Sequence, residues 1–159
     1  MGESRGTAAE LYDVFVDWPG RLGREMPGLT ARLRAAGARS VLDAGCGTGR
    51  HVAALREAGF DAVGADASDD MLAQARAFTG APDLFFRWRM GEPPPPELEA
   101  RGPFDAIVCM GNAWPQILGD SEVVATQRAW RSMLAPSGAV LMGLKALAVR
   151  REKGDPYMP

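Results

Sequence analysis

Three alternating glycines and two acidic residues have the types and spacing of a site that binds a ribose. Gly45, Gly47 and Gly49 follow a short apolar run that contains Asp43, and Asp66 ends the next apolar run. Alternating glycines let the backbone turn sharply and let a ligand approach where a Cβ would block it. A carboxylate at the end of the next strand can accept two hydrogen bonds from a ribose 2′,3′-diol. These residues predict a ribose-bearing cofactor; the alternatives are a tight turn without a ligand and an acidic helix cap.

The spacing of the glycines bears on which cofactor this is. A dinucleotide-binding fingerprint, Gly-x-Gly-x-x-Gly, requires a small residue five positions after the first glycine. Here that position is Arg50, and the third glycine, Gly49, comes one residue early. A phosphate-binding P-loop is excluded because no Gly-Lys-Ser or Gly-Lys-Thr follows. An oxidoreductase that uses NAD is therefore disfavoured.

Strand and helix patterns alternate along the chain. Short apolar runs predict buried strands over residues 40–44, 61–66, 84–88, 104–110 and 139–144. Helical spacing predicts helices over residues 8–16, 20–36, 50–58 and 121–134, and one more capped by Ser68. The alternation predicts an α/β fold, with a doubly wound parallel sheet covered on both faces. Four consecutive prolines, 93–96, predict a stiff, extended connection.

The composition is that of one globular domain. The 159 residues carry a formal net charge of −2 and are 47% hydrophobic, which leaves no broad basic field for nucleic acid. No stretch approaches the roughly 20 apolar residues of a membrane helix, and no secretory pattern is visible at the N-terminus. Because there are only two cysteines, Cys46 and Cys109, we expect a reducing, cytoplasmic location. No residue cluster has the spacing of a metal site.

Four motifs resemble, in order, those of the class I S-adenosylmethionine-dependent methyltransferases. They are Val41–Arg50 for the first motif, Gly64–Ser68 with Met71 for the second, Phe104–Cys109 for the fourth strand and Leu134–Ala139 for the turn into the fifth. The resemblance implies a Rossmann-like sheet of order 3-2-1-4-5, without the last two strands that the family usually has. It also implies S-adenosylmethionine as the cofactor and S-adenosylhomocysteine as the product.

The resemblance implies roles for individual residues. Asp43 would interact with the ammonium group of the cofactor, directly or through water, and Asp66 would hold the ribose diol. Ala67 and Met71 would line the adenine, and Met90 would pack on its ring. The other implied cofactor contacts lie in the glycine loop and just after the fourth strand: Ala44, Gly45, Cys46, Gly47, Gly49, Met110, Gly111 and Asn112.

The chain departs from the family after the third strand. An acid or amide that binds the adenine amino group usually stands there, whereas this chain has Arg89 and Met90. Adenine recognition is then left to backbone groups, and Glu92 is a weaker candidate.

The N-terminal stretch Leu11–Phe15, with Trp18, Arg21, Arg24 and Glu25, resembles the lid helices of small-molecule members such as the glycine N-methyltransferase type. This resemblance predicts Tyr12, Trp18 and Arg24 over the cofactor. The alternative is that the aromatic side chains anchor the lid to the body of the protein, and we favour this alternative for Trp18. Tyr12 and Asn112 are the candidates for a catalytic role, with Trp114 beside them in the acceptor site.

The implied activity is methyl transfer to a small-molecule acceptor by in-line displacement. A nitrogen acceptor that arrives deprotonated needs no strong base, whereas an oxygen acceptor would need His51 or Tyr12 as the base. Trp114-Pro115 stands where amino-directed nucleic-acid methyltransferases carry Asn/Asp-Pro-Pro-aromatic, which disfavours DNA as the acceptor. The alternative function is a cofactor-binding module, or a truncated fragment, without turnover of its own and dependent on a partner chain.

We expect one S-adenosylmethionine-binding domain over residues 1–159. It would comprise lid helices over residues 1–37, a Rossmann-like core over 38–146 and a tail over 147–159. The tail is too short for the two further strands of the family, so the apolar fifth strand becomes an edge, which soluble proteins normally cover. We expect a second copy of the chain, in a homo-oligomer, or a C-terminal region missing from this sequence to cover it.

Overall fold

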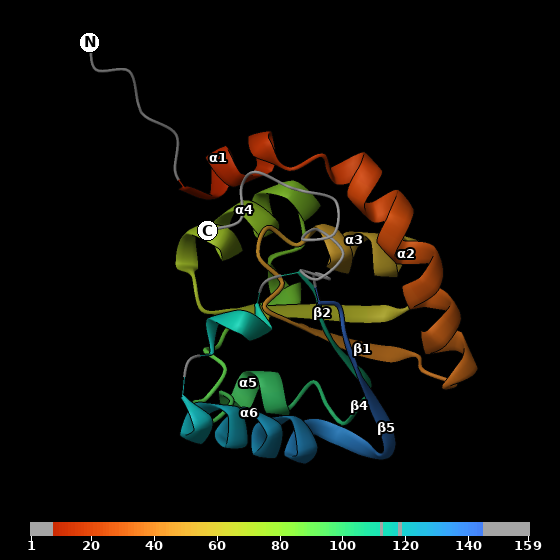
Figure 1. Cartoon of the computed structure of the whole chain (residues 1–159), viewed down its shortest axis with the longest axis vertical. Coiled ribbons are helices and arrows are strands. Elements are labelled where there is room, and N and C mark those ends of the chain that lie inside the picture. Colours follow the sequence, from red (N-terminus) through yellow and green to blue (C-terminus); the bar gives the residue numbers. More distant parts are fainter. Residues whose placement is uncertain (1–7, 112, 118, 145–159) are drawn as a thin grey trace, which may run out of the picture.

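The computed structural model describes residues 8–111, 113–117 and 119–144, which form a parallel sheet between two layers of helices (Figure 1). The strands are β1 Ser40–Ala44, β2 Asp61–Asp66, β3 Phe85–Arg87, β4 Phe104–Cys109 and β5 Leu134–Met142. They pair in parallel in the order β3-β2-β1-β4-β5. The predicted α/β class and strand order are confirmed.

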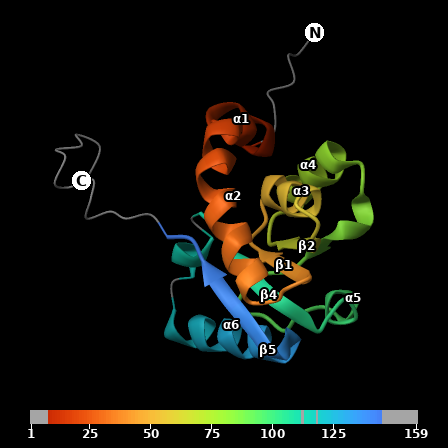
Figure 2. The same ribbon diagram turned by 90° about the vertical axis from the view of Figure 1, so that its right-hand side faces the viewer.

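The helices divide between the two faces of the sheet. They are α1 Ala8–Phe15, α2 Trp18–Ala35, α3 Arg50–Glu57, α4 Asp69–Thr79, α5 Pro96–Glu99 and α6 Asp120–Met133. The first four lie on one side of the sheet, and α5 and α6 lie on the other (Figures 1 and 2). None of the helices in the described segments is long and apolar enough to cross a lipid bilayer.

Alternate residues of the strands face two separate cores. In β1, Val41 belongs to the core under α2, α3 and α4, and Leu42 belongs to the core over α5 and α6. In β4, Val108 and Ile107 divide in the same way. Side chains alternate because successive residues of a strand point to opposite faces. This double burial explains why the central strands are continuous apolar runs rather than alternating ones.

Two prolines act differently from the prediction. The helix predicted from residue 20 begins earlier, at Trp18, and Pro19 stands in the first turn of this helix, α2, where its missing N–H is no loss. Asp17 caps that helix because its side chain accepts a hydrogen bond from Gly20 N at 3.0 Å. Pro96, expected in an extended connection, begins the short helix α5, which buries Leu98.

The fifth strand begins earlier than predicted. It starts at Leu134, directly after α6, because Leu134 pairs with Phe104 at the start of β4. A register shift between Phe104 and Ala106 then brings Ala139 opposite Ala106, as the apolar run requires. The strand ends at Met142 rather than at Leu144.

Candidate active site

A cavity of about 820 Å³ lies at the carboxyl ends of β1, β2 and β4, between the sheet and the helices α1 and α2. This volume is within the range of about 300–1,000 Å³ that is typical of small-molecule sites. The predicted site residues that line it are Tyr12, Gly45, Cys46, Gly47, Asp66, Ala67, Met71, Met90, Met110 and Gly111. Of the lid residues, Trp18 and Arg24 line it as well. The structure therefore brings most of the predicted residues to one cavity.

Three residues of β1 and the glycine loop do not line this cavity, although the resemblance implies that they contact the cofactor. Asp43 and Ala44 are buried within β1. Gly49 faces the protein interior, where a Cβ would lie 2.9 Å from Ala75 Cβ and from the Phe85 ring. A residue without a side chain is required at position 49 because the start of α3 packs closely there, and not because a ligand approaches it. Another predicted residue, Asn112, lies outside the described residues.

Asp66 holds the glycine loop in shape. Its Oδ2 accepts a hydrogen bond from Gly47 N at 2.8 Å, and its Oδ1 accepts one from Ser68 N at 2.9 Å. Gly47 has φ +53°, and apart from its two chain neighbours no atom of the described residues lies within 4 Å of the position that its Cβ would occupy. An ionised carboxylate has lone pairs for about four hydrogen bonds, so Asp66 can still accept two from a diol. The loop and Asp66 together form an open cradle beside the cavity.

Asp43 places a carboxyl group behind this cradle. This residue is 1% exposed, and neither carboxyl oxygen has a hydrogen-bond partner in the part of the chain that the structure describes. Burial raises the pKa of Asp43 to about 6; the charge of His51 opposes this rise and that of Asp66 adds to it. A cationic ligand in the adjacent cavity would favour the ionised carboxylate.

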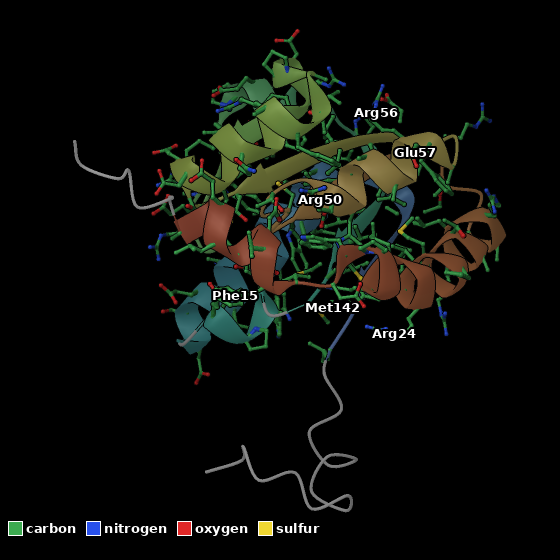
Figure 3. The ribbon with its side chains drawn as sticks, turned by 90° about the horizontal axis from the view of Figure 1, so that it is seen from above. Phe15, Arg24, Arg50, Arg56, Glu57 and Met142 are labelled. Carbon is green, nitrogen blue, oxygen red and sulfur yellow. The ribbon has the colours of Figure 1, made fainter. Side chains whose placement is uncertain are left out.

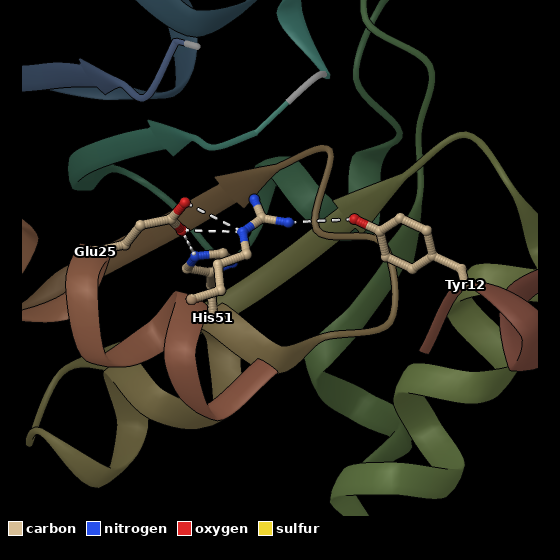
Figure 4. A network of polar contacts seen from close by, with 4 residues as sticks. Tyr12, Glu25 and His51 are labelled. Carbon is tan, nitrogen blue, oxygen red and sulfur yellow. Dashed lines mark hydrogen bonds and ion pairs between the residues drawn. The ribbon is translucent and has the colours of Figure 1, made fainter. Parts of the chain in front are cut away.

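A chain of polar contacts crosses from the lid to the core (Figure 4). Arg21 Nη1 donates to the Tyr12 hydroxyl at 3.3 Å, and Arg21 Nε lies 3.1 Å from Glu25 Oε1. The other oxygen of Glu25, Oε2, lies 2.7 Å from His51 Nε2. Arg21 also reaches the end of β4, because a Cβ on Gly111 would lie 2.5 Å from Arg21 Nη2. Arg21 and Glu25 are not among the predicted site residues, although their i, i+4 spacing on a helix favours such a pair.

Trp18 is buried and links the start of α2 to α1 and α3. Its Nε1 donates a hydrogen bond to Asp13 Oδ1 at 2.8 Å. Its ring meets those of Tyr12 and His51 edge-on, with centroids 5.9 and 6.0 Å apart. Arg24 extends from α2 on the same side of the molecule as Met142 (Figure 3).

Trp114 and Glu92 do not line the cavity, contrary to the positions expected for them. The Trp114 ring packs on the Trp130 ring, with centroids 5.2 Å apart, so it belongs to the core over α6. The neighbours of Glu92, Arg89 and Met90, do line the cavity.

Neither cysteine is a nucleophile. Burial raises the pKa of Cys46 well above its ordinary value and raises that of Cys109 to about 12, so both thiols stay protonated at neutral pH. His51, considered as a base, is buried and hydrogen-bonded to Glu25. Among the described residues, no group of three His, Cys, Asp or Glu side chains is placed to hold a metal ion.

The fold and the site define a class of protein: a Rossmann-like sheet whose glycine loop and second-strand acid share one cavity is the architecture of class I methyltransferases. Residues 41–138 match the family model described as "Methyltransferase domain". The chain belongs to this family, within the class I S-adenosylmethionine-dependent methyltransferases.

Among its relatives, the chain is similar to several N-methyltransferases that act on small molecules, as their names state. The chain is 30% identical over 156 residues to a glycine/sarcosine N-methyltransferase of Parasynechococcus marenigrum, covering 93% of this chain and 55% of the relative. The sugar N-methyltransferase KedS8 of Streptoalloteichus has a TM-score of 0.70 at 28% identity, covering 89% of this chain and 55% of that one. The amino pentose methyltransferase CalS10 of Micromonospora echinaspora, solved with S-adenosylmethionine bound, has a TM-score of 0.65 at 25% identity, covering 89% and 58%. The chain thus spans little more than half the length of these proteins.

Proposed function

We propose that this chain binds S-adenosylmethionine and transfers its methyl group to the nitrogen of a small molecule. The observation that carries the proposal is the cradle: Gly47 and Asp66 both line the cavity, and Asp66 accepts a hydrogen bond of 2.8 Å from the Gly47 backbone N–H. A side chain on the loop would fill this space, and Asp66 matches the two hydroxyls of a ribose.

The lining residues suggest how the cofactor is oriented. Asp66 would hold the ribose, with Ala67, Met71 and Met90 around the adenine. The methionine end would then lie near Met110 and Gly111 at the end of β4, where Arg21 can pair with its carboxylate. Asp43, across the cavity wall, would favour its ammonium group. Charge-assisted pairs of this kind are the stronger hydrogen bonds of proteins.

When bound, S-adenosylmethionine supplies a methyl group already activated by a sulfonium. The residues of this chain then have to align an acceptor with it and exclude water, which can supply several kcal/mol. The Tyr12 hydroxyl, held by Arg21, is the described group best placed to orient the acceptor, and Asn112 stays a candidate. Glu25 and His51 are engaged with each other, which suits an amine that arrives deprotonated and needs no base.

The names of the relatives support a nitrogen acceptor. The curated relative is named for glycine and sarcosine, and one solved neighbour is named for the nitrogen of a sugar. For this chain we propose the shared chemistry, a primary or secondary amine on a small polar molecule.

Two measurements test the proposal. Calorimetric titration with S-adenosylmethionine and S-adenosylhomocysteine should give saturable binding, and absence of binding would overturn the proposal. Formation of S-adenosylhomocysteine is then followed with glycine, sarcosine and amino sugars as acceptors. Cofactor binding without product from any acceptor would favour the alternative, a binding module that depends on a partner chain.

Asp66→Ala is expected to weaken S-adenosylhomocysteine binding by roughly 1–3 kcal/mol, because the ribose loses charge-assisted hydrogen bonds. Calorimetry measures the change. Asp69→Ala is the control, since Asp69 is an exposed acid in the first turn of α4 and should bind as the wild type does. An unchanged affinity in the Asp66 variant would remove that residue from the ribose site.

We also propose that a second copy of this chain covers β5. Val140 and Met142 are 40% and 47% exposed on this strand, and no strand in the described segments pairs with its outer edge. Exposed apolar edges are normally paired or covered. Light scattering after size exclusion should therefore show a dimer, and Val140→Lys should shift it toward the monomer; a monomeric wild type at micromolar concentration contradicts this expectation.

The free thiols of Cys46 and Cys109 support the further proposal of a cytoplasmic location.

A further inference from the structure

Asp13, in the last turn of α1, joins three parts of the protein through one carboxylate. Its Oδ1 accepts hydrogen bonds from Thr48 Oγ1 at 2.6 Å and from Trp18 Nε1 at 2.8 Å. Its Oδ2 lies 2.8 Å from Arg50 Nη2. Trp18 begins α2, Thr48 belongs to the glycine loop and Arg50 begins α3. A single side chain of the lid therefore contacts the loop that forms the cradle.

The groups around Asp13 are fixed from other directions as well. Thr48 is buried, and the Arg50 guanidinium lies 3.6 Å from the centroid of the Phe78 ring, over α4. Arg50 points inward between α3 and α1, whereas Arg56 on the same helix points outward (Figure 3). The Asp13 side chain itself is only 8% exposed. Because the partners of Asp13 are themselves held in place, this contact can fix the position of α1 relative to the glycine loop.

The contacts of Asp13 favour its ionised form. Burial acts to raise its pKa, but the hydrogen bonds from Arg50, Thr48 and Trp18 together outweigh burial and leave the pKa below its ordinary value. The carboxylate is therefore ionised at neutral pH, and its hydrogen bonds belong to the charge-assisted kind.

We propose that Asp13 is a positioning residue: it locks the lid onto the glycine loop and so holds Tyr12 and Arg21 over the methionine end of the cofactor. The proposal rests on the proposed function. Tyr12 is the neighbour of Asp13 in α1. Arg21 is linked to the same contact through Trp18, because its guanidinium carbon lies 5.1 Å from the centroid of that ring.

The effect of Asp13 should be confined to one end of the cavity. Arg21 reaches Gly111 after β4, whereas the ribose cradle is held by Asp66 from β2. Loss of Asp13 should therefore weaken contacts to the amino-acid end of the ligand and leave contacts to the nucleoside. Adenosine, which lacks the amino-acid end, separates the two.

The test is calorimetric titration of Asp13→Ala with S-adenosylhomocysteine and, separately, with adenosine. We expect the affinity for S-adenosylhomocysteine to fall about tenfold or more and the affinity for adenosine to change less than about twofold. Asp17→Asn is the matched control: Asp17 is also an acid of the lid, its described hydrogen bond is the cap of α2, and Asn caps as well as Asp. This variant should bind both ligands as the wild type does.

Equal losses for the two ligands would show a general structural role and overturn the proposal, as would unchanged affinity for both. If Asp13→Ala does not fold, Thr48→Val removes one donor and should show the same selective loss, at smaller size. Hydrogen exchange of the free protein supplies a readout without ligand: amides of residues 8–16 should exchange faster in the Asp13 variant than in the Asp17 control. Failure of the wild type to bind S-adenosylhomocysteine would count against the proposed function, while the exchange result still decides whether Asp13 locks the lid.

Discussion

Gly47→Val is expected to weaken S-adenosylhomocysteine binding about a hundredfold or more while the protein stays folded. Gly47 lines the cavity, and beyond its two chain neighbours no described atom lies within 4 Å of the position of its Cβ, so a side chain there clashes with none of the described residues. The valine methyl groups would instead occupy the space that the ligand needs. The left-handed backbone, at φ +53°, adds strain of about 1–3 kcal/mol. Calorimetry measures the affinity, and circular dichroism with thermal melting measures the fold and its stability.

Gly37→Val separates the two effects. Gly37 has φ +69° and equally open surroundings, but it lies just after α2, outside the cavity lining. It should show a similar loss of stability with unchanged affinity. If Gly47→Val keeps the affinity of the wild type, the glycine loop is a turn and not a cradle.

Asp43→Asn is expected to stabilise the free protein at neutral pH by on the order of 3 kcal/mol. The buried carboxyl has a pKa of about 6 in the folded protein, against about 3.9 when unfolded. The folded state therefore binds the proton more tightly, and the stability that this gives is present below pH 4 and is lost as the pH rises through 6. An amide cannot ionise, so the variant should lose this pH dependence.

Thermal unfolding between pH 4 and 8 measures this difference. Asp105→Asn is the control of opposite sign, because hydrogen bonds from Ser40 N and Arg39 N, at 2.9 and 2.8 Å, lower the pKa of Asp105. A carboxyl whose pKa is lowered by folding stabilises the protein at every pH above the pKa of that group in the unfolded chain. The Asp105→Asn variant loses this contribution, so it should be less stable than the wild type at neutral pH. Equal pH profiles for the wild type and Asp43→Asn would show that Asp43 does not carry this cost.

Asp43→Asn should also weaken S-adenosylmethionine binding, because the cationic ligand loses a nearby negative charge. A variant that is more stable and binds less well would show that the chain tolerates an unfavourable buried acid for the sake of its ligand. Unchanged affinity would instead place Asp43 outside the reach of the ammonium group.

Much of the fold follows from local patterns in the sequence. Val41 and Leu42 stand in a strand that is buried on both faces, which produces a continuous apolar run. The left-handed conformations of Gly45 and Gly47 favour residues without a Cβ, so the glycines alone predict the loop. The strand order, by contrast, came from the family resemblance, because crossover spacing does not determine it.

What the sequence does not reveal depends on contacts between distant residues. Gly49 has the same residue type and the same sign of φ as Gly47, yet it faces Ala75 and Phe85 rather than the cavity. Asp13 meets Thr48 and Arg50 across more than thirty positions of chain, and no local pattern marks such a meeting. The predicted start of β5 is wrong for a related reason, because the observed start at Leu134 is set by pairing with Phe104.

The hydrogen bonds from Gly47 and Ser68 to Asp66 give the loop its shape before any ligand arrives. A nucleoside that binds as we propose would meet backbone that is already ordered, so little conformational entropy would be lost on association. The association rate would then be set by diffusion and by the relative orientation of the two molecules rather than by folding of the loop.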